Sequence, residues 1–460
     1  FSEKEKIEFL KSLISKKTNI IKNFNFKNEE NKEVWSTFKT LSFEPAECLG
    51  AYVISMTSSA SDILSVFFLQ KEANIKNKLR VVPLFETLDD LINSKSIMQS
   101  LFSQKWYRKL IKNKQEVMIG YSDSGKDAGK MCASWHQYKA QEEIVKLAKK
   151  FNIEVVFFHG RGGSAGRGGG PIQATLRSLP PNSVNGKIRI TDQGEVIQQK
   201  YGYEPLAKYN ICSYIGAVTE ATLNPPPTPK NNWRDLTEKM SDIAKSSYRK
   251  NINQNSDFIK YFKIVTPHVA LGKLSIGSRP SKRKNVDTIK SLRAIPWVFA
   301  WTQVRLMLPA WLGSTEALRY AYHKRSRKIL FDMEKNWPFF NAMLDMLDMV
   351  ISKVDPDISK IYEEFLADES LKKVGKKLRF QFDSIKKLNK KITPKEIAVI
   401  RKPFRSQIIV RNIYSEVLNI IQPVVIRKLK VNKNSKNKQY LNDALLTSIA
   451  GISAAMKNTG

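Results

Sequence analysis

The sequence predicts an α/β fold in which helices outnumber strands. Five short apolar runs, rich in β-branched and aromatic residues, recur at similar spacing in the first half of the chain. Segments with helical periodicity lie between them, and strands that alternate with helices at this spacing indicate βα units around a parallel sheet. After the proline-rich stretch 224–230, long amphipathic segments replace the alternation, so the rest of the chain is expected to be mainly helical.

The five expected strands are the runs 51–56, 81–85, 117–121, 154–158 and 188–191. Their continuous apolar character fits strands that are buried on both faces of a sheet. Helical periodicity predicts helices over 127–150, 232–250, 297–310, 315–336 and 440–457. The stretch 427–438 carries six basic residues among Asn and Ser, and we expect it to be a solvated loop.

Length and composition predict a folded protein of two to three domain-sized units, because the chain has 460 residues, of which 42% are hydrophobic and 10% aromatic. No apolar run reaches the roughly 18 residues that a membrane-spanning helix needs. The longest candidate, 296–313, contains Arg305 and two prolines. The three cysteines and four histidines are dispersed, which indicates a reducing compartment and no structural zinc site.

The formal net charge of +34 raises the possibility of a polyanionic partner. The basic residues are spread over the whole length, however, whereas nucleic-acid-binding proteins concentrate them on one face. A diffuse basic surface is therefore expected rather than a dedicated nucleic-acid site.

Charged and polar side chains follow four of the five expected strands. Such positions form the active site in (β/α) barrels and in open α/β sheets. Four occurrences in succession favour an active site over coincidence. The residues are Glu86, Asp123, Lys126, His159, Arg161, Gln193 and Glu195.

The segment 159–171 reads HGRGGSAGRGGGP and predicts an anion-binding loop. Glycine lets the main chain approach a ligand closely, and the guanidinium groups of Arg161 and Arg167 suit phosphate or carboxylate. The segment 120–127, GYSDSGKD, lacks the Ser or Thr that follows the lysine in a P-loop, but Lys126 remains a candidate anion contact. A single copy of an RGG-like stretch is not typical of RNA-binding segments, which are repeated.

Glu86 and Asp123 are carboxylates at two successive strand ends. Two carboxylates, together with water and substrate oxygens, are the usual protein environment of Mg²⁺. The alternative is that each residue is a helix N-cap or a surface acid, and the sequence leaves both interpretations open.

Eight blocks of sequence point to one family: YVISM, PLFETLDDL, VMIGYSDSGKDAG, FHGRGGSAGRGGGP, SLRAIPWVFAWTQ, LPAWLG, VRNIY and the terminal NTG. In this order they resemble the C-terminal half of phosphoenolpyruvate carboxylase, over about residues 1–460. The resemblance implies a (β/α)₈ TIM-barrel-type fold. Residues 1–230 would form a partial barrel with a strand-end active site, and 231–460 a mainly helical region with a mobile loop and an effector site.

The resemblance also implies a cytoplasmic homotetramer that replenishes the tricarboxylic acid cycle. The family converts phosphoenolpyruvate and bicarbonate to oxaloacetate and phosphate, via carboxyphosphate and an enolate, with Mg²⁺ or Mn²⁺. By the matching motifs, Glu86 and Asp123 would hold the metal and Lys126 would face the substrates. Arg161, aided by Arg293, would grip the phosphoryl group.

A second group of residues would serve the loops and regulation. Arg167 would contact the carboxyphosphate region, and Arg279 begins the mobile loop that covers the site. Lys353, Arg411 and Asn458 would hold a dicarboxylic acid effector such as aspartate, which would draw Arg167 away from the substrates.

Two departures from the family pattern bear on activity. The N-terminal half of the family, which supplies a catalytic histidine and a further arginine, is absent from this sequence, so the chain is expected to need that half. In the mobile loop, NVDTIKS places Lys290 at a position that is acidic in the family. A non-catalytic or degraded remnant that keeps the fold, and a basic nucleic-acid-binding protein, are the alternative hypotheses.

Overall fold

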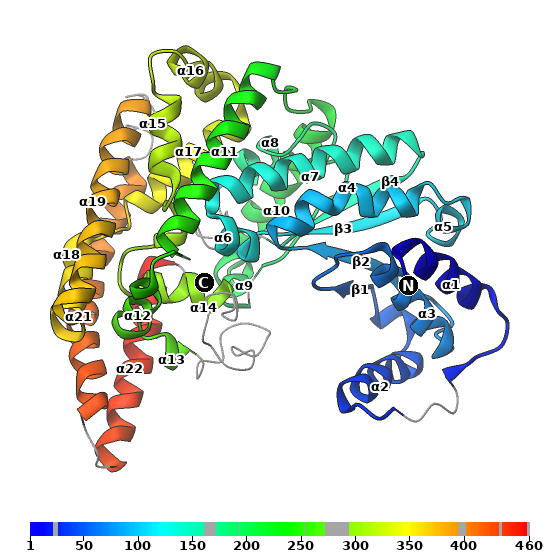
Figure 1. Ribbon diagram of the computed structural model, residues 1–460, viewed down its shortest axis with the longest axis horizontal. Helices are drawn as coiled ribbons and strands as arrows, with labels where there is room; N and C mark the ends of the chain where they lie inside the picture. The colour runs from blue at the N-terminus through cyan, green and yellow to red at the C-terminus, as the bar shows by residue number, and fades with distance from the viewer. Residues whose placement is uncertain are drawn as a thin grey trace. The chain divides into compact units, whose positions relative to one another are not determined.

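The computed structural model describes residues 1–21, 26–160, 172–192, 194–252, 254–271, 294–393, 402–431 and 435–457 (Figure 1). The chain forms two compact units, each described below by itself. Unit 1 comprises residues 1–120, 139–160 and 182–189, and unit 2 comprises 121–138, 161–181 and 190–460. The functional division at residue 230 stays a prediction.

Unit 1 contains the parallel sheet and the helices that connect its strands. Its elements are α1 (Glu3–Ser15), α2 (Glu29–Phe43), η2 (Ala46–Cys48), β1 (Ala51–Ile54), α3 (Ala60–Glu72), β2 (Arg80–Phe85), α4 (Leu88–Phe102), α5 (Lys105–Leu110), β3 (Lys114–Gly120), most of α7 (Lys130–Lys150), β4 (Glu154–Gly160) and the first residue of β5 (Arg189–Ile190).

The five strands lie in the order in which they occur in the sequence, β1-β2-β3-β4-β5. The pairs β1–β2, β2–β3 and β3–β4 are parallel, so each connection crosses over through a helix. This confirms the α/β prediction and all five predicted strand positions, although the described strands are not a complete eight-stranded barrel. β4 is longer than predicted, because His159 pairs with Ile119 inside the sheet rather than following the strand.

Unit 2 is helical. Its elements are α6 (Ser122–Ala128), the start of α7, α8 (Ile172–Arg177), α9 (Gly194–Tyr201), α10 (Glu204–Leu223), α11 (Asn231–Ile252), α12 (Ser256–Val265), α13 (His268–Leu271), α14 (Ala294–Gln303), η5 (Leu308–Ala310), α15 (Ser314–Ala321), α16 (Arg327–Asn336), α17 (Pro338–Ile351), α18 (Pro356–Leu366), α19 (Glu369–Ile392), α21 (Lys402–Val431) and α22 (Ser435–Met456).

The core of unit 2 is rich in aromatic side chains. The ring of Phe262 packs against both Trp297 and Trp301 of α14, with ring centroids 4.9 and 5.5 Å away. A second group contains Trp135, Tyr138, Trp337 and Phe339. Large buried rings contribute much apolar area, which stabilises a unit that has few strands to hold its helices in place.

Three segment predictions are corrected by the structure. The helix expected over 297–310 breaks after Gln303, where Arg305 and Met307 have positive φ, and resumes as η5. The segment 315–336 forms two helices, α15 and α16, rather than one. The basic stretch at 427–431 is the last turn of α21 and not a loop, because Lys and Arg are good helix formers and are favoured at the helix C-terminus.

Within the described residues, no helix has the length and apolar character that crossing a membrane requires.

Candidate functional site

Glu86 lies where β2 turns into α4. Its side chain is only 7% exposed, and Oε1 accepts a hydrogen bond of 2.8 Å from the Met56 backbone N–H. Thr87 is the N-cap of α4, and the Asp90 carboxylate accepts hydrogen bonds from the N–H groups of Glu86 and Thr87. Glu86 is therefore neither an N-cap nor a surface acid, but a buried carboxylate that the turn holds at the strand end.

The end of β3 approaches Glu86 closely at Gly120. A Cβ on that residue would lie 2.7 Å from the Glu86 Cα. Because real Cβ contacts are not this short, any side chain at this position would displace the strand end. Glycine is thus required here by close backbone approach.

Asp123 and Lys126 lie on α6, the short helix that follows β3. Both are half-buried. Helix α11 fixes this turn: the Tyr248 hydroxyl donates to the Lys126 carbonyl at 2.8 Å, and Arg249 pairs with the Asp127 carboxylate at 2.9 Å. Asp123 is in the first turn of α6, where backbone N–H groups favour an acidic side chain.

Several predicted site residues lie outside the described residues: Arg161, Arg167, Arg279, Arg293 and Asn458. Glu86 belongs to unit 1, whereas Asp123 and Lys126 belong to unit 2, so the pairing of these carboxylates around a metal stays a prediction. In the described part of the chain, no group of three or more His, Cys, Asp or Glu side chains could hold a metal ion by itself.

Lys353 and Arg411 come together at the end of α22. The Lys353 Nζ donates to the Met456 carbonyl at 2.8 Å, and the Arg411 Nη1 donates to the Ala455 carbonyl at 3.0 Å. Carbonyl groups at a helix C-terminus attract cations. Two of the predicted effector residues, separated by α18 and α19 in the sequence, therefore contact successive carbonyls just ahead of Asn458.

The surroundings of Lys353 carry a positive potential. Burial, reinforced by the charges of Arg411, Lys457 and Arg305, lowers the pKa of Lys353 to about 8. Nearby positive charges and removal from water both disfavour the ammonium form. An anion bound at this place would offset that cost, so the cluster of cations has the electrostatic character of an anion site.

Arg305 supports this cluster, although no sequence motif indicated a role for it. Its Nε donates to the Lys353 carbonyl at 3.1 Å, and its Nη2 donates to the Asn412 side chain at 3.0 Å. Arg305 is 1% exposed and has a φ of 56°. The one available signal was the charge inside the apolar run 296–313, because a buried arginine needs partners that are hydrogen-bond acceptors.

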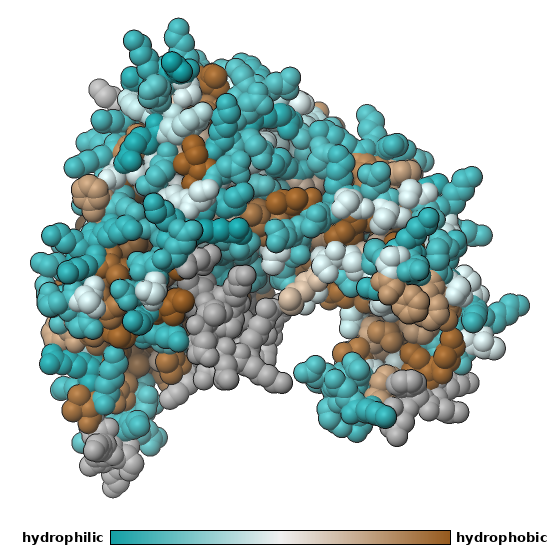
Figure 2. Space-filling view, in the orientation of Figure 1, coloured by the Kyte–Doolittle hydropathy of each residue, from teal (hydrophilic) through white to brown (hydrophobic). Residues whose placement is uncertain are grey.

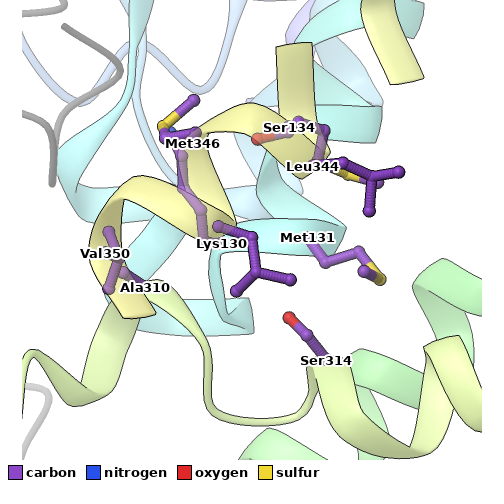
Figure 3. Close-up of a pocket in the computed structure, with 10 residues that line it drawn as sticks. Lys130, Met131, Ser134, Ala310, Ser314, Leu344, Met346 and Val350 are labelled. Atoms are coloured by element: carbon purple, nitrogen blue, oxygen red, sulfur yellow. The ribbon is translucent and has the colours of Figure 1, made fainter. Parts of the chain in front are cut away.

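A small pocket in unit 2 lies elsewhere and contains none of the predicted site residues. Methionine side chains from α7 and α17 line it, together with Leu344, Val350 and Ala310 (Figure 3). Its polar groups are Lys130, Ser134 and Ser314. A mostly apolar lining does not suit the small anions that the arginine motifs predict.

The parallel βα units, with a buried carboxylate held at a strand end, are typical of α/β enzymes. The family model described as phosphoenolpyruvate carboxylase matches residues 1–460. The chain belongs to the phosphoenolpyruvate carboxylase family. This membership favours the carboxylase hypothesis over nucleic-acid binding.

Three relatives are each called phosphoenolpyruvate carboxylase. The chain is 44% identical to the Shewanella sediminis protein over 461 residues, which covers 100% of this chain and 52% of the relative. It is 47% identical to the Acinetobacter baylyi protein, and the match covers 93% of this chain and 48% of the relative. It is 43% identical to phosphoenolpyruvate carboxylase 3 of Arabidopsis thaliana, and this match covers 94% of the chain and 48% of the relative. The chain thus spans about half the length of the curated relatives it matches, and corresponds to their C-terminal half.

Proposed function

We propose that this chain is the C-terminal half of a phosphoenolpyruvate carboxylase, which joins phosphoenolpyruvate and bicarbonate to give oxaloacetate and phosphate. The family match over residues 1–460 is the observation that carries the proposal. The buried, oriented carboxylate of Glu86 at a strand end supports it, because the active sites of such folds lie there. A homotetramer in the cytoplasm stays a prediction from the family resemblance.

The chemistry requires groups that stabilise negative charge. Bicarbonate attacks the phosphorus, the bond from phosphorus to the enol oxygen breaks, and the phosphoryl group leaves as carboxyphosphate while the substrate remains as an enolate. Loss of phosphate from carboxyphosphate releases CO₂, which the enolate carbon attacks. Fixed cations aimed at these oxygens lower the barriers of such steps.

We assign these cations from the family motifs. Arg161 and Arg293 would hold the phosphoryl group, and Arg167 the carboxyphosphate. Lys126 would face the substrates, a role supported by the fixed backbone of α6. Arg279 would belong to the loop that excludes water, so that the enolate meets CO₂ before a proton.

Mg²⁺ or Mn²⁺ would be held by Glu86 and Asp123, since carboxylate oxygens are the ligands these ions prefer. A bound divalent ion supplies charge stabilisation to phosphoryl and enolate oxygens. The hydrogen bond from Met56 fits this role, because it fixes the orientation of the Glu86 carboxylate.

Electron paramagnetic resonance titration of Mn²⁺ tests the metal assignment on the 460-residue chain itself. We expect weak binding that the double variant Glu86→Gln, Asp123→Asn abolishes. Asp89→Asn removes an exposed carboxylate three residues from Glu86 and should leave binding unchanged. Equal binding by the wild type and the double variant would refute the assignment.

We further propose that Lys353, Arg411, Asn458 and Arg167 bind a dicarboxylic acid effector such as aspartate. The neighbouring contacts of Lys353 and Arg411 at the end of α22 support this, as does the lowered pKa of Lys353. Binding of the acid and of substrate must then weaken each other by the same factor.

Calorimetry of aspartate binding tests the effector site. Lys353→Ala should weaken the affinity at least tenfold, whereas Lys360→Ala, which removes an exposed lysine, should not. Wild-type affinity should also fall as the pH rises through about 8, because Lys353 then loses its charge. Undiminished affinity in Lys353→Ala would remove the site from the proposal.

A further inference from the structure

Helix α21 has its polar face buried and its apolar face exposed. Asn412, Ser415, Asn419 and Gln422 recur at intervals of three and four residues, and the last three are fully buried. Val410, Ile413, Val417 and Ile420 recur at the same intervals, displaced by two residues, and are exposed. Because successive helical residues turn by about 100°, a displacement of two residues places the two rows on nearly opposite faces.

Hydrogen bonds hold the polar face inward. Asn419 donates to the Gln303 carbonyl at 2.7 Å, and Gln422 donates to the Gln303 Oε1 at 3.1 Å. Tyr362 donates its hydroxyl to Gln422 at 2.8 Å, and Arg305 donates to Asn412 at 3.0 Å. The helix cannot rotate its apolar side into unit 2 without breaking this network, so the orientation is built in.

The exposed side of α21 is apolar over more than three turns, with the half-buried Glu416 at its border. Every exposed residue from 409 to 421 is apolar. We call this surface the α21 seam; it consists of Ile409, Val410, Ile413, Tyr414, Val417, Ile420 and Ile421, which are 46% to 73% exposed. Figure 2 shows apolar residues on the surface over the hairpin of α21 and α22. A contiguous apolar patch of this kind marks an interaction site.

The spacing of the seam identifies the kind of partner. Alternating intervals of three and four residues, with Val and Ile at each position, are the pattern with which one helix packs on another. Over residues 409–421 the seam is about 18 Å long at 1.5 Å per residue. The partner is therefore a helix with a matching apolar stripe.

Charge disfavours a second copy of this chain as the partner. The exposed charged residues that follow the seam on α21 are Arg427, Lys428 and Lys430, all basic, and the whole chain carries +34. Two copies would bring like charges together, whereas a helix flanked by acidic residues would be attracted. The relatives contain about as much chain again as is present here, so their N-terminal half is a possible source of such a helix.

We infer that the α21 seam is a docking surface for a helix, with acidic flanks, from the N-terminal half of the family fold. The binding is helix against helix, and its free energy comes from burying the seven side chains of the seam.

Co-expression tests the inference. The 460-residue chain is produced together with an affinity-tagged first half of the Shewanella sediminis relative, the part that this chain does not span. We expect wild-type chain to co-purify with it, and the variant Ile413→Asp, Val417→Asp to be recovered at least tenfold less. Phe380→Asp on α19 is the matched control, because Phe380 and Ile413 are both 73% exposed; it should co-purify like the wild type.

Failure of the wild type to co-purify, or equal recovery of both variants, would overturn the inference. Sedimentation velocity tests the alternative that two copies of the chain pair through the seam. A wild-type dimer that the variant Ile413→Asp, Val417→Asp abolishes would overturn the inference in favour of this alternative. Hydroxyl-radical labelling of the wild type needs no variant: Tyr414 in the seam should become protected in the complex, while Tyr440 on α22, 74% exposed, should not. Unchanged labelling of Tyr414 would contradict the docking surface.

Discussion

Helices α19 and α21 are long helices of the same unit with opposite arrangements of polar and apolar residues. α19 buries Leu378, Phe382 and Ile385. Its outward face is basic, with Lys373, Lys376, Lys377, Lys386, Lys387, Lys390 and Lys391 exposed. α21 instead buries amides and hydroxyls and exposes Ile and Val. The outward face of α19 suits contact with water, whereas the exposed face of α21 suits contact with another apolar surface.

The largest expected effect comes from removing a buried side chain on the apolar side of α19. Phe382 is fully buried, with its ring 5.5 Å from that of Trp311. Phe382→Ala should lower the free energy of unfolding by about 3–5 kcal/mol, through lost burial and the cavity it leaves. Ile413→Ala on the α21 seam should change it by about 0.5 kcal/mol or less. Guanidinium denaturation of the chain measures both, and a similar cost for the two would show that the seam is already covered.

The next effect concerns the charge beside α21. Lys353 has a pKa of about 8 in the folded chain and about 10.5 when unfolded. Between these two pH values the unfolded chain binds more protons than the folded chain, so the free energy of unfolding should rise with pH. Below about pH 8 Lys353 is charged in both states, and the folded chain bears the whole cost of burying that charge. The gain is about 3 kcal/mol at most. Lys353→Met should remove this rise when unfolding is compared at pH 7.5 and 10; a rise of the same size in the variant would assign it to other groups.

The smallest expected effect comes from replacing a buried polar side chain of α21. Gln422→Leu would remove the acceptor of the Tyr362 hydroxyl proton and the donor to the Gln303 Oε1, both inside the unit. Such a loss costs about 1–3 kcal/mol. Gln407→Leu, at an exposed position of the same helix, should be nearly neutral. Thermal unfolding followed by circular dichroism compares the two, and equal melting temperatures would mean that the network does not set the orientation of α21.

The comparison also shows which structural features a sequence pattern can predict and which it cannot. Runs such as VVPLF and EVVFF predicted β2 and β4, because strands buried on both faces are apolar without alternation. Glu86 and Lys353 were found through motifs. The pattern could not show that α21 is inverted, because an amphipathic helix is expected to turn its apolar face inward, and only contacts with Gln303 and Tyr362 reveal the reverse.

The sequence also could not predict which residues pair with the buried polar groups. Lys353 contacts a carbonyl at position 456, and Arg305 contacts Asn412. These pairs are about a hundred residues apart in the sequence and are fixed by the packing of helices, which local periodicity does not determine. The break at Arg305 was missed for the same reason, since its positive φ serves contacts with distant segments.

The strand lengths have a consequence for aggregation. Among the described strands, β1 and β5 stand at the two ends of the sheet and have four and two residues, whereas β2, β3 and β4 have six, seven and seven. A strand at a sheet edge presents backbone groups on which another chain can pair, and short edge strands limit this pairing. Two of the long strands, β2 and β3, which would be effective templates for fibrils, each pair with a strand on both sides. The position of β2 and β3 inside the sheet therefore keeps these two strands from seeding intermolecular β-structure.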